Sequence, residues 1–123
     1  MHHAYRTLIL VAGICCLPLF AHAAPAAVPA NPAQEKLLAA TEAERSVILT
    51  AYLARDKVTC TGVTKTFYQG NDHRGNVFWN VACSEGTTYV IQIFNNEINS
   101  TRSYDCVRLK EDTGGTCFTK FKQ

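Results

Sequence analysis

Four widely spaced cysteines constrain the fold of this chain more than any other feature. In the 123-residue sequence they are separated by 23, 23 and 11 positions, and they are Cys60, Cys83, Cys106 and Cys117. In a short exported chain an even number of cysteines predicts two disulfides, because such bridges persist in an oxidising compartment and stabilise a small core. Structural zinc sites need closely spaced cysteine pairs, so this spacing argues against zinc.

The N-terminus predicts export. Residues 1–6 are weakly positive, residues 7–20 form an apolar run, and Ala21-His22-Ala23 fits a small-x-small cleavage site. We expect a signal peptide over residues 1–23, cleaved after Ala23, and a periplasmic or secreted protein with no stable membrane span after processing. A membrane anchor is disfavoured because about 20 apolar residues are needed to cross a bilayer and Pro18 interrupts the run. Lipid attachment at Cys15 or Cys16 is disfavoured by Ile14, which is not a small residue.

Size and charge leave room for one small domain. Removing residues 1–23 leaves 100 residues, a formal charge of +1 because only Arg6 is lost from the total of +2, and a single histidine, His73. Such a chain is too short for a multi-domain enzyme, and it lacks the clustered Lys and Arg that nucleic-acid binding requires. Residues 24–33 (APAAVPANPA) are uncharged and predict an Ala/Pro-rich linker that precedes one domain over residues 34–123.

One main helix is predicted after the linker. Residues 34–56 begin with helix formers and continue with Val47, Ile48, Ala51 and Tyr52, which share one helical face. Two start signals compete. Asn31 followed by Pro32 is a cap with a first-turn proline, whereas residues 41–44 (TEAE) form a capping box that would split the helix. We expect a stable helix over residues 42–55 and a looser portion before it.

After residue 57 the pattern becomes that of strands. Residues 57–68, 76–83 and 87–94 are rich in Val, Thr, Ile and aromatic side chains and are bounded by Gly and Asn. A weaker strand is expected through residues 104–109, followed by a terminal hairpin that turns at residues 112–115. One strand face gathers Trp79, Val81, Cys83, Tyr89, Ile91 and Ile93. The fold class is therefore α+β, with one main N-terminal helix packed on an antiparallel sheet of about four or five strands, disulfide-bonded.

The expected turns predict the disulfide pairing. A terminal hairpin centred between residues 111 and 112 would place Cys106 opposite Cys117 at a normal disulfide separation. A first hairpin turning around residues 72 and 73 would bring Cys60 diagonal to Cys83, which leaves these two for the second bridge. A crossed connectivity stays open, because Cys60, Cys83 and Cys106 would lie near one end of the sheet.

One segment resembles a known group of proteins. The helix followed by an antiparallel meander is similar to a PepSY-type layout, and residues 75–89 (GNVFWNVACSEGTTY) resemble a pattern of small, largely uncharacterised periplasmic proteins of Gram-negative bacteria. PepSY-type domains bind or restrain peptidases, so the resemblance implies a non-enzymatic module that binds a partner. The four cysteines and the expected terminal hairpin depart from that pattern. Periplasmic lysozyme inhibitors are a second comparison, in architecture alone.

Catalytic patterns have simpler interpretations. Asp112-Thr113-Gly114 matches the D-T-G of aspartic peptidases, but it follows Lys110-Glu111 and not an apolar strand, so we interpret it as a solvated turn. No G-x-S-x-G elbow occurs, and two bridges leave no mature cysteine as a nucleophile. Asn99-Ser100-Thr101 is a glycosylation sequon, which matters only in a eukaryotic source. We predict a non-enzymatic protein with no metal and no cofactor.

Binding of a protein partner is the function we expect. Loops on a rigid sheet often provide recognition, and aromatic side chains with Arg are favoured anchors. The expected contact residues lie in the first hairpin turn and beside it: Asn71, Asp72, His73, Arg74, Tyr68 and Phe78. Two simpler interpretations stay open, that His73 is an ordinary surface residue and that Phe78 packs on the second face of the sheet. The alternative function is a structural or assembly subunit of a cell-envelope complex that uses an exposed sheet edge.

Overall fold

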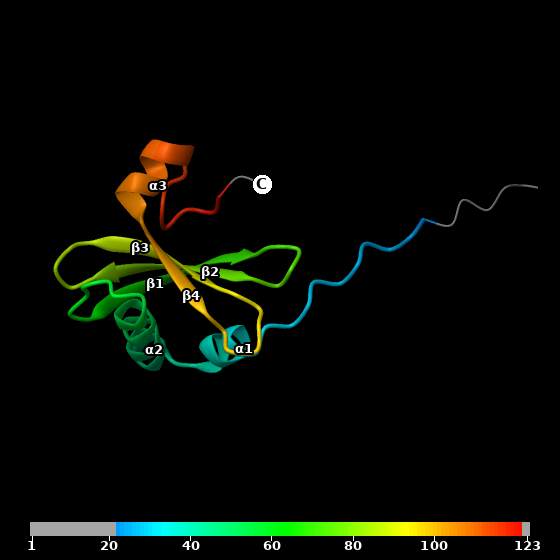
Figure 1. Ribbon diagram of the computed structural model, residues 1–123, viewed down its shortest axis with the longest axis horizontal. Coiled ribbons are helices and arrows are strands. Elements are labelled where there is room, and N and C mark those ends of the chain that lie inside the picture. Colours follow the sequence, from blue (N-terminus) through cyan, green and yellow to red (C-terminus); the bar gives the residue numbers. More distant parts are fainter. Residues whose placement is uncertain (1–21, 122–123) are drawn as a thin grey trace, which may run out of the picture.

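Three helices and one sheet make up the structure, a computed structural model that describes residues 22–121. The elements are α1 (Pro32–Ala39), α2 (Glu42–Arg55), β1 (Val63–Asn71), β2 (Val77–Cys83), β3 (Thr88–Ile93), β4 (Thr101–Asp105) and α3 (Cys106–Thr113). The four strands form an antiparallel sheet in the order β1-β2-β3-β4. The helices α1 and α2 lie on one side of the sheet, and α3 lies on the other side with the C-terminal segment (Figure 1). This arrangement confirms the α+β fold class.

Both predicted helix-start signals are used, and they produce two helices. Asn31 caps α1, since its Oδ1 accepts hydrogen bonds from the N–H groups of Ala33 and Gln34. At residue 41 the capping box forms in both directions between Thr41 and Glu44. The Arg45 guanidinium then donates to the carbonyls of Leu37 and Ala40, both at 2.9 Å, which satisfies carbonyls at the end of α1.

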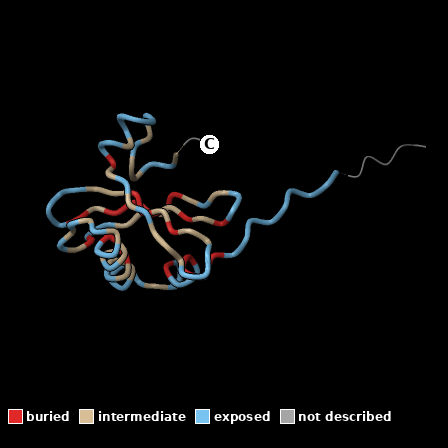
Figure 2. The backbone as a smooth tube through the Cα atoms, in the orientation of Figure 1, coloured by how far each residue is buried: buried red, intermediate tan, exposed pale blue. Residues whose placement is uncertain are grey.

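The expected linker ends earlier than predicted. Residues 22–30 are exposed and have no regular structure (Figure 2). Asn31 and Ala33 are buried and belong to the domain. The cap at Asn31 and the tertiary contacts that it makes order this region. Apart from residues 22 and 23, the predicted signal peptide lies outside the described residues.

The core lies between the sheet and the first two helices. Its fully buried members include Leu37, Leu49 and Leu53 from the helices, and the predicted strand face provides Trp79, Val81, Cys83, Ile91 and Ile93. The predicted helix face was wrong by about one position, because Val47 is 71% exposed. Leu49 and Leu53 form a larger apolar stripe with Ile48 and Tyr52, so they turn toward the sheet instead.

The C-terminal part differs from the sequence prediction. The expected fourth strand is present as β4, but it lies earlier than the predicted residues 104–109 and ends at Asp105. The predicted terminal hairpin is wrong, because the chain enters α3 there. The Asp105 carboxylate caps α3 by accepting from the N–H groups of Val107 and Arg108. Gly114, with φ of +75°, ends the helix in the left-handed conformation. The D-T-G tripeptide is therefore a helix terminus and not a turn between strands.

The first strand also begins later than predicted. Residues 57–62 connect α2 to β1 in place of the start of a strand, and β1 continues to Asn71. Lys57, with φ of +60°, turns the chain away from α2. The second and third strands lie within one residue of their predicted limits.

Both predicted disulfides form. Cys60 pairs with Cys83 at a Cα–Cα distance of 5.5 Å, and Cys106 pairs with Cys117 at 6.0 Å. The second bridge joins the first residue of α3 to the C-terminal segment, and the expected hairpin is not needed for it. Two disulfides are typical of an oxidising, extracytoplasmic compartment. Within residues 22–121 no helix is long and apolar enough to cross a bilayer.

Candidate functional site

The β1–β2 turn (residues 72–76) is held by its own hydrogen bonds. The Asp72 carboxylate accepts from the N–H groups of Arg74 and Asn76 at 2.9 and 3.0 Å, and from the Asn76 side-chain amide at 2.8 Å. The main chain closes the turn through Asp72 N–H to the Asn76 carbonyl and Gly75 N–H to the Asp72 carbonyl. The turn is therefore ordered by side-chain and main-chain bonds together.

These bonds also set the charge state of Asp72. Partial desolvation raises the pKa of the carboxyl, but hydrogen bonds from Asn76 and Arg74, together with the nearby His73, outweigh it, so the pKa lies below its ordinary value. The carboxylate is thus ionised near neutral pH and is engaged inside the turn.

The turn is fixed to the rest of the domain from behind. Gly75 has φ of +80°, and a Cβ at this position would lie 2.5 Å from the Pro29 carbonyl oxygen. The buried Asn31 donates its Nδ2 hydrogens to the carbonyls of Gly75 at 3.0 Å and Ile93 at 3.4 Å. The residues before α1 therefore clamp the turn, which leaves its outer side as the exposed surface.

A hollow of about 350 Å³ lies beside this turn. Its lining consists of Gln69, Gly70, Asn71, Asp72, His73, Phe78 and Phe121, and we call it the turn hollow. Asn71 and His73 are exposed, whereas Phe78 is half-buried on the sheet face opposite the first two helices. An exposed polar rim over half-buried aromatic rings is a common composition for a recognition surface.

The structure brings together most of the residues predicted for the site. Asn71, Asp72, His73 and Phe78 line the turn hollow, and Arg74 is exposed on the adjoining turn. Tyr68 does not line it, because its ring packs against Trp79 with the ring centroids 5.2 Å apart. Burial there raises the pKa of the Tyr68 hydroxyl. Tyr68 pairs with Trp79 across β1 and β2, so its side chain lies on the sheet face that the helices cover, whereas Phe78, which precedes Trp79 on β2, points to the opposite face.

The C-terminal segment contributes a residue that the sequence did not indicate. The Phe121 N–H donates to Gln69 Oε1, and Gln69 Nε2 donates to the Thr119 carbonyl and to Asn80 Oδ1. Asn80, which is fully buried, also accepts from the Phe118 N–H. This amide pair binds residues 118–121 across the sheet and so places Phe121 in the turn hollow.

A larger hollow of about 500 Å³ lies between α3 and the C-terminal segment. Lys120 is the one ionisable side chain among the described residues that line it, which are Leu109, Thr113, Gly114, Gly115, Thr116, Thr119, Lys120 and Phe121. The Lys120 ammonium already donates to the carbonyls of Tyr68 and Gln69. This hollow therefore offers no pair of acid and base groups for catalysis.

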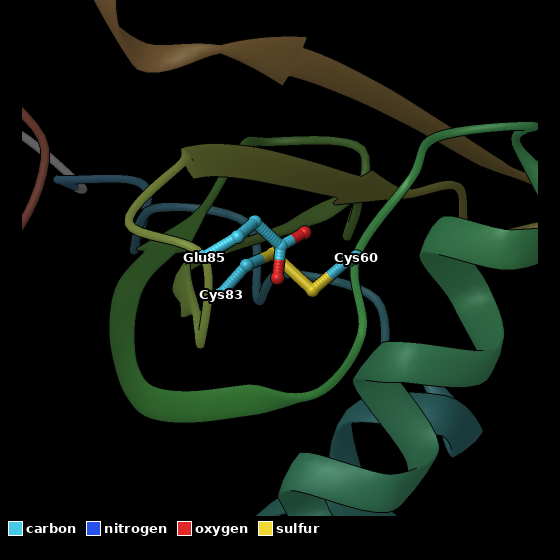
Figure 3. A group of neighbouring side chains, drawn as sticks. All are labelled: Cys60, Cys83 and Glu85. Carbon is cyan, nitrogen blue, oxygen red and sulfur yellow. A yellow bond between two sulfur atoms is a disulfide. The ribbon is translucent and has the colours of Figure 1, made fainter.

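One group of possible metal ligands occurs within residues 22–121: Cys60, Cys83 and Glu85 (Figure 3). The two sulfur atoms are bonded to each other, so neither is available as a thiolate ligand. The Glu85 carboxylate accepts from the Thr61 N–H and the Ser84 hydroxyl. With the disulfide formed, the group consists of the Cys60–Cys83 bridge and the hydrogen-bonded carboxylate of Glu85 beside it.

The fold and the site define a class of protein: a small α+β domain with two disulfides and an ordered, exposed turn beside a shallow hollow. Comparison of the chain with protein families, with curated proteins and with solved structures found no match. The resemblance to PepSY-type domains therefore stays a prediction.

We expect acidification to weaken the turn through Asp72. Because its pKa is lowered by folding, its contribution to the free energy of unfolding is complete above the unfolded pKa of about 4 and is lost as the pH falls through the folded value. Solvent screening keeps this contribution under about 1 kcal/mol. Urea unfolding of wild type and Asp72→Asn should differ at about pH 7 and converge at an acidic pH below the folded pKa of Asp72. The exposed Asp112→Asn serves as the control, and an equal Asp72→Asn difference at both pH values would contradict the expectation.

Proposed function

We propose that this protein is an exported, periplasmic module that binds and restrains a protein partner without catalysis, through the β1–β2 turn and the turn hollow. The observation that supports this most is the order of the turn. Asp72 fixes it from within, and Asn31 and Pro29 fix it from behind, while His73 and Arg74 remain exposed. A surface that is already ordered loses little conformational entropy on binding, which favours affinity.

The composition of the surface favours a protein partner. Phe78 and Phe121 supply apolar area at the base of the turn hollow, and Arg74 supplies a cation beside it. Aromatic and Arg side chains are frequent in the residues that dominate protein interfaces. The predicted likeness to PepSY-type domains directs the proposal toward a peptidase or a lytic enzyme of the envelope as the partner. After cleavage following Ala23, the exposed residues 24–30 would form a free N-terminal extension of the domain (Figure 1).

Site-specific photocrosslinking in intact cells tests this proposal. A photoreactive amino acid placed at His73 should yield one discrete protein adduct in the envelope fraction. The same amino acid at Arg108, which is exposed on α3, is the matched control and should yield none. With the captured partner in hand, Arg74→Ala should weaken binding about tenfold, which corresponds to about 1.4 kcal/mol. Equal crosslinking from both positions, or none from His73, would contradict the proposal.

A structural or assembly role in an envelope complex is the second candidate. It is favoured by the exposed sheet edge at β4, whose residues are half-buried or exposed. The same crosslinking experiment, with the photoreactive amino acid also placed at the exposed Arg102 on β4, separates the two functions. Adducts to several subunits of one large assembly would support the structural role, whereas a single soluble enzyme would support the inhibitory one.

A further inference from the structure

The two edges of the sheet differ in whether side chains bond to their outward main-chain groups. At the β1 edge, the Val63 N–H donates to Thr50 Oγ1 and the Thr66 N–H donates to the Glu42 carboxylate, both at 3.0 Å. The Tyr68 carbonyl, also at this edge, accepts from the Lys120 ammonium at 2.6 Å. Side chains thus occupy the outward main-chain groups of β1, which prevents another strand from pairing there.

The β4 edge has no such protection. The Phe94 N–H donates to the Ser100 carbonyl, and hydrogen-bonded pairs alternate along an antiparallel ladder. The register of β3 with β4 therefore directs the main-chain groups of Arg102 and Tyr104 toward β3, and those of Thr101 and Ser103 outward. Within residues 22–121 no side chain hydrogen-bonds to these outward groups of Thr101 and Ser103.

The side-chain hydroxyls of β4 form hydrogen bonds on the sheet face and not at the outer edge of the strand. Thr101 and Ser103 donate through their hydroxyls to the two oxygens of Asp56, at the end of α2. Side chains stand perpendicular to the hydrogen-bonding direction of a strand. Asp56 therefore holds β4 in place, while the outward main-chain groups of β4 remain available for pairing with another strand.

Three exposed apolar side chains lie on β4 or close to it along the chain. Tyr104 on β4 is 38% exposed, and Ile98 and Val107, just before and just after the strand, are 77% and 64% exposed. Isolated apolar residues on a surface are ordinary, but these three flank a single unpaired strand. Because Ile98 and Val107 lie at opposite ends of β4, an antiparallel copy of the strand would bring Ile98 of one copy and Val107 of the other to the same end.

We propose that β4 is the interface of a homodimer, in which β4 of two copies pairs in antiparallel orientation about Ser103 and joins the two sheets into one. In this register Ser103 faces its counterpart, so the outward main-chain groups of the two Ser103 residues meet as a hydrogen-bonded pair. Thr101 faces Asp105, whose N–H meets the Thr101 carbonyl, while the Asp105 carbonyl accepts within α3 as its N-cap residue. Arg102 faces Tyr104 of the other copy, which favours a cation–π contact. No two like charges stand opposite each other, so the sequence of the strand is complementary to itself.

Sedimentation of the purified, disulfide-bonded protein tests the proposal. Wild type should form a dimer, and Tyr104→Arg should raise its Kd at least about tenfold because it places two arginines opposite each other. Tyr104→Glu is the matched variant and should keep the dimer, since the carboxylate faces Arg102 of the other copy. Val107→Lys should weaken the dimer, whereas Val47→Lys, on the exposed side of α2, should not. Far-UV circular dichroism checks that each variant is folded.

Crosslinking tests the register directly. Facing residues that are not hydrogen-bonded have their side chains closest, so a mixture of Arg102→Cys and Tyr104→Cys proteins should form a disulfide-linked dimer on mild oxidation. Either variant alone should link far less. A wild type that stays monomeric up to about 1 mM would overturn the proposal and leave the edge to a strand of another protein. Equal effects of Tyr104→Arg and Tyr104→Glu, or equal crosslinking in the single variants, would overturn it as well.

Discussion

Replacing Trp79 by Ala should lower the free energy of unfolding by about 4 kcal/mol, because it empties the largest side chain from the core. Trp79 is 3% exposed, and its Nε1 hydrogen donates to Gln34 Oε1 at 2.8 Å. The Arg45 guanidinium lies 5.1 Å from the ring centroid. A single domain is usually stable by about 5–15 kcal/mol, so this one change would leave the fold marginal. The substitution removes the only Trp of the chain and with it the Trp fluorescence signal, so far-UV circular dichroism during urea unfolding measures the effect.

A pair of conservative variants separates the packing of Trp79 from its hydrogen bond. Trp79→Phe keeps most of the apolar area but removes the indole N–H donor. The side-chain oxygen of the buried Gln34 then loses this hydrogen bond. Adding Gln34→Leu removes that unpaired group, so we expect it to recover about 1 kcal/mol in the Trp79→Phe background. A loss below about 1 kcal/mol in Trp79→Ala would contradict the central place of this residue in the core.

Removing the Cys60–Cys83 bridge by substituting both residues with Ala should cost about 3 kcal/mol. The bridge closes a loop between residues 23 positions apart, and the chain-entropy account gives a value of this size for such a loop. It ties the connection after α2 to the end of β2, so its loss should lower the stability of the helices and the sheet together. Urea unfolding of the double variant against wild type measures the cost.

The second bridge provides the comparison. Substituting Cys106 and Cys117 with Ala should mainly release residues 116–121, which lie across the sheet, while the helix-covered core stays intact. Hydrogen exchange should then show faster exchange in that segment and little change in β2 and β3. Equal, global loss of stability in the two double variants would contradict this division. In wild type, alkylation under denaturing conditions without reductant should label none of the four cysteines.

The candidate site could be predicted in part, because its turn is local. The Gly- and Asn-rich sequence of residues 69–76 indicated a turn, and Asp72, Gly75 and Asn76 form it through bonds within five residues. Phe121 could not be predicted as a neighbour of this turn. Its position depends on hydrogen bonds between Gln69 and a segment about fifty residues further along the chain. The sequence also could not show that Tyr68 faces Trp79 and the core, because the register of β1 with β2 depends on pairing between two separate strands.

The sequence by itself determined the local features: the caps at Asn31 and Thr41 and the two central strands. These follow from propensity and spacing over a few residues, which the chain specifies wherever it folds. Tertiary structure decided the rest. The segment after β4 forms a helix whose first residue, Cys106, is bonded to Cys117 in the C-terminal segment, although the pattern of its residues also suits a strand. Which face of α2 is buried, which sheet edge stays open, and where the C-terminal segment lies depend on contacts between distant residues, whose energies no local pattern records.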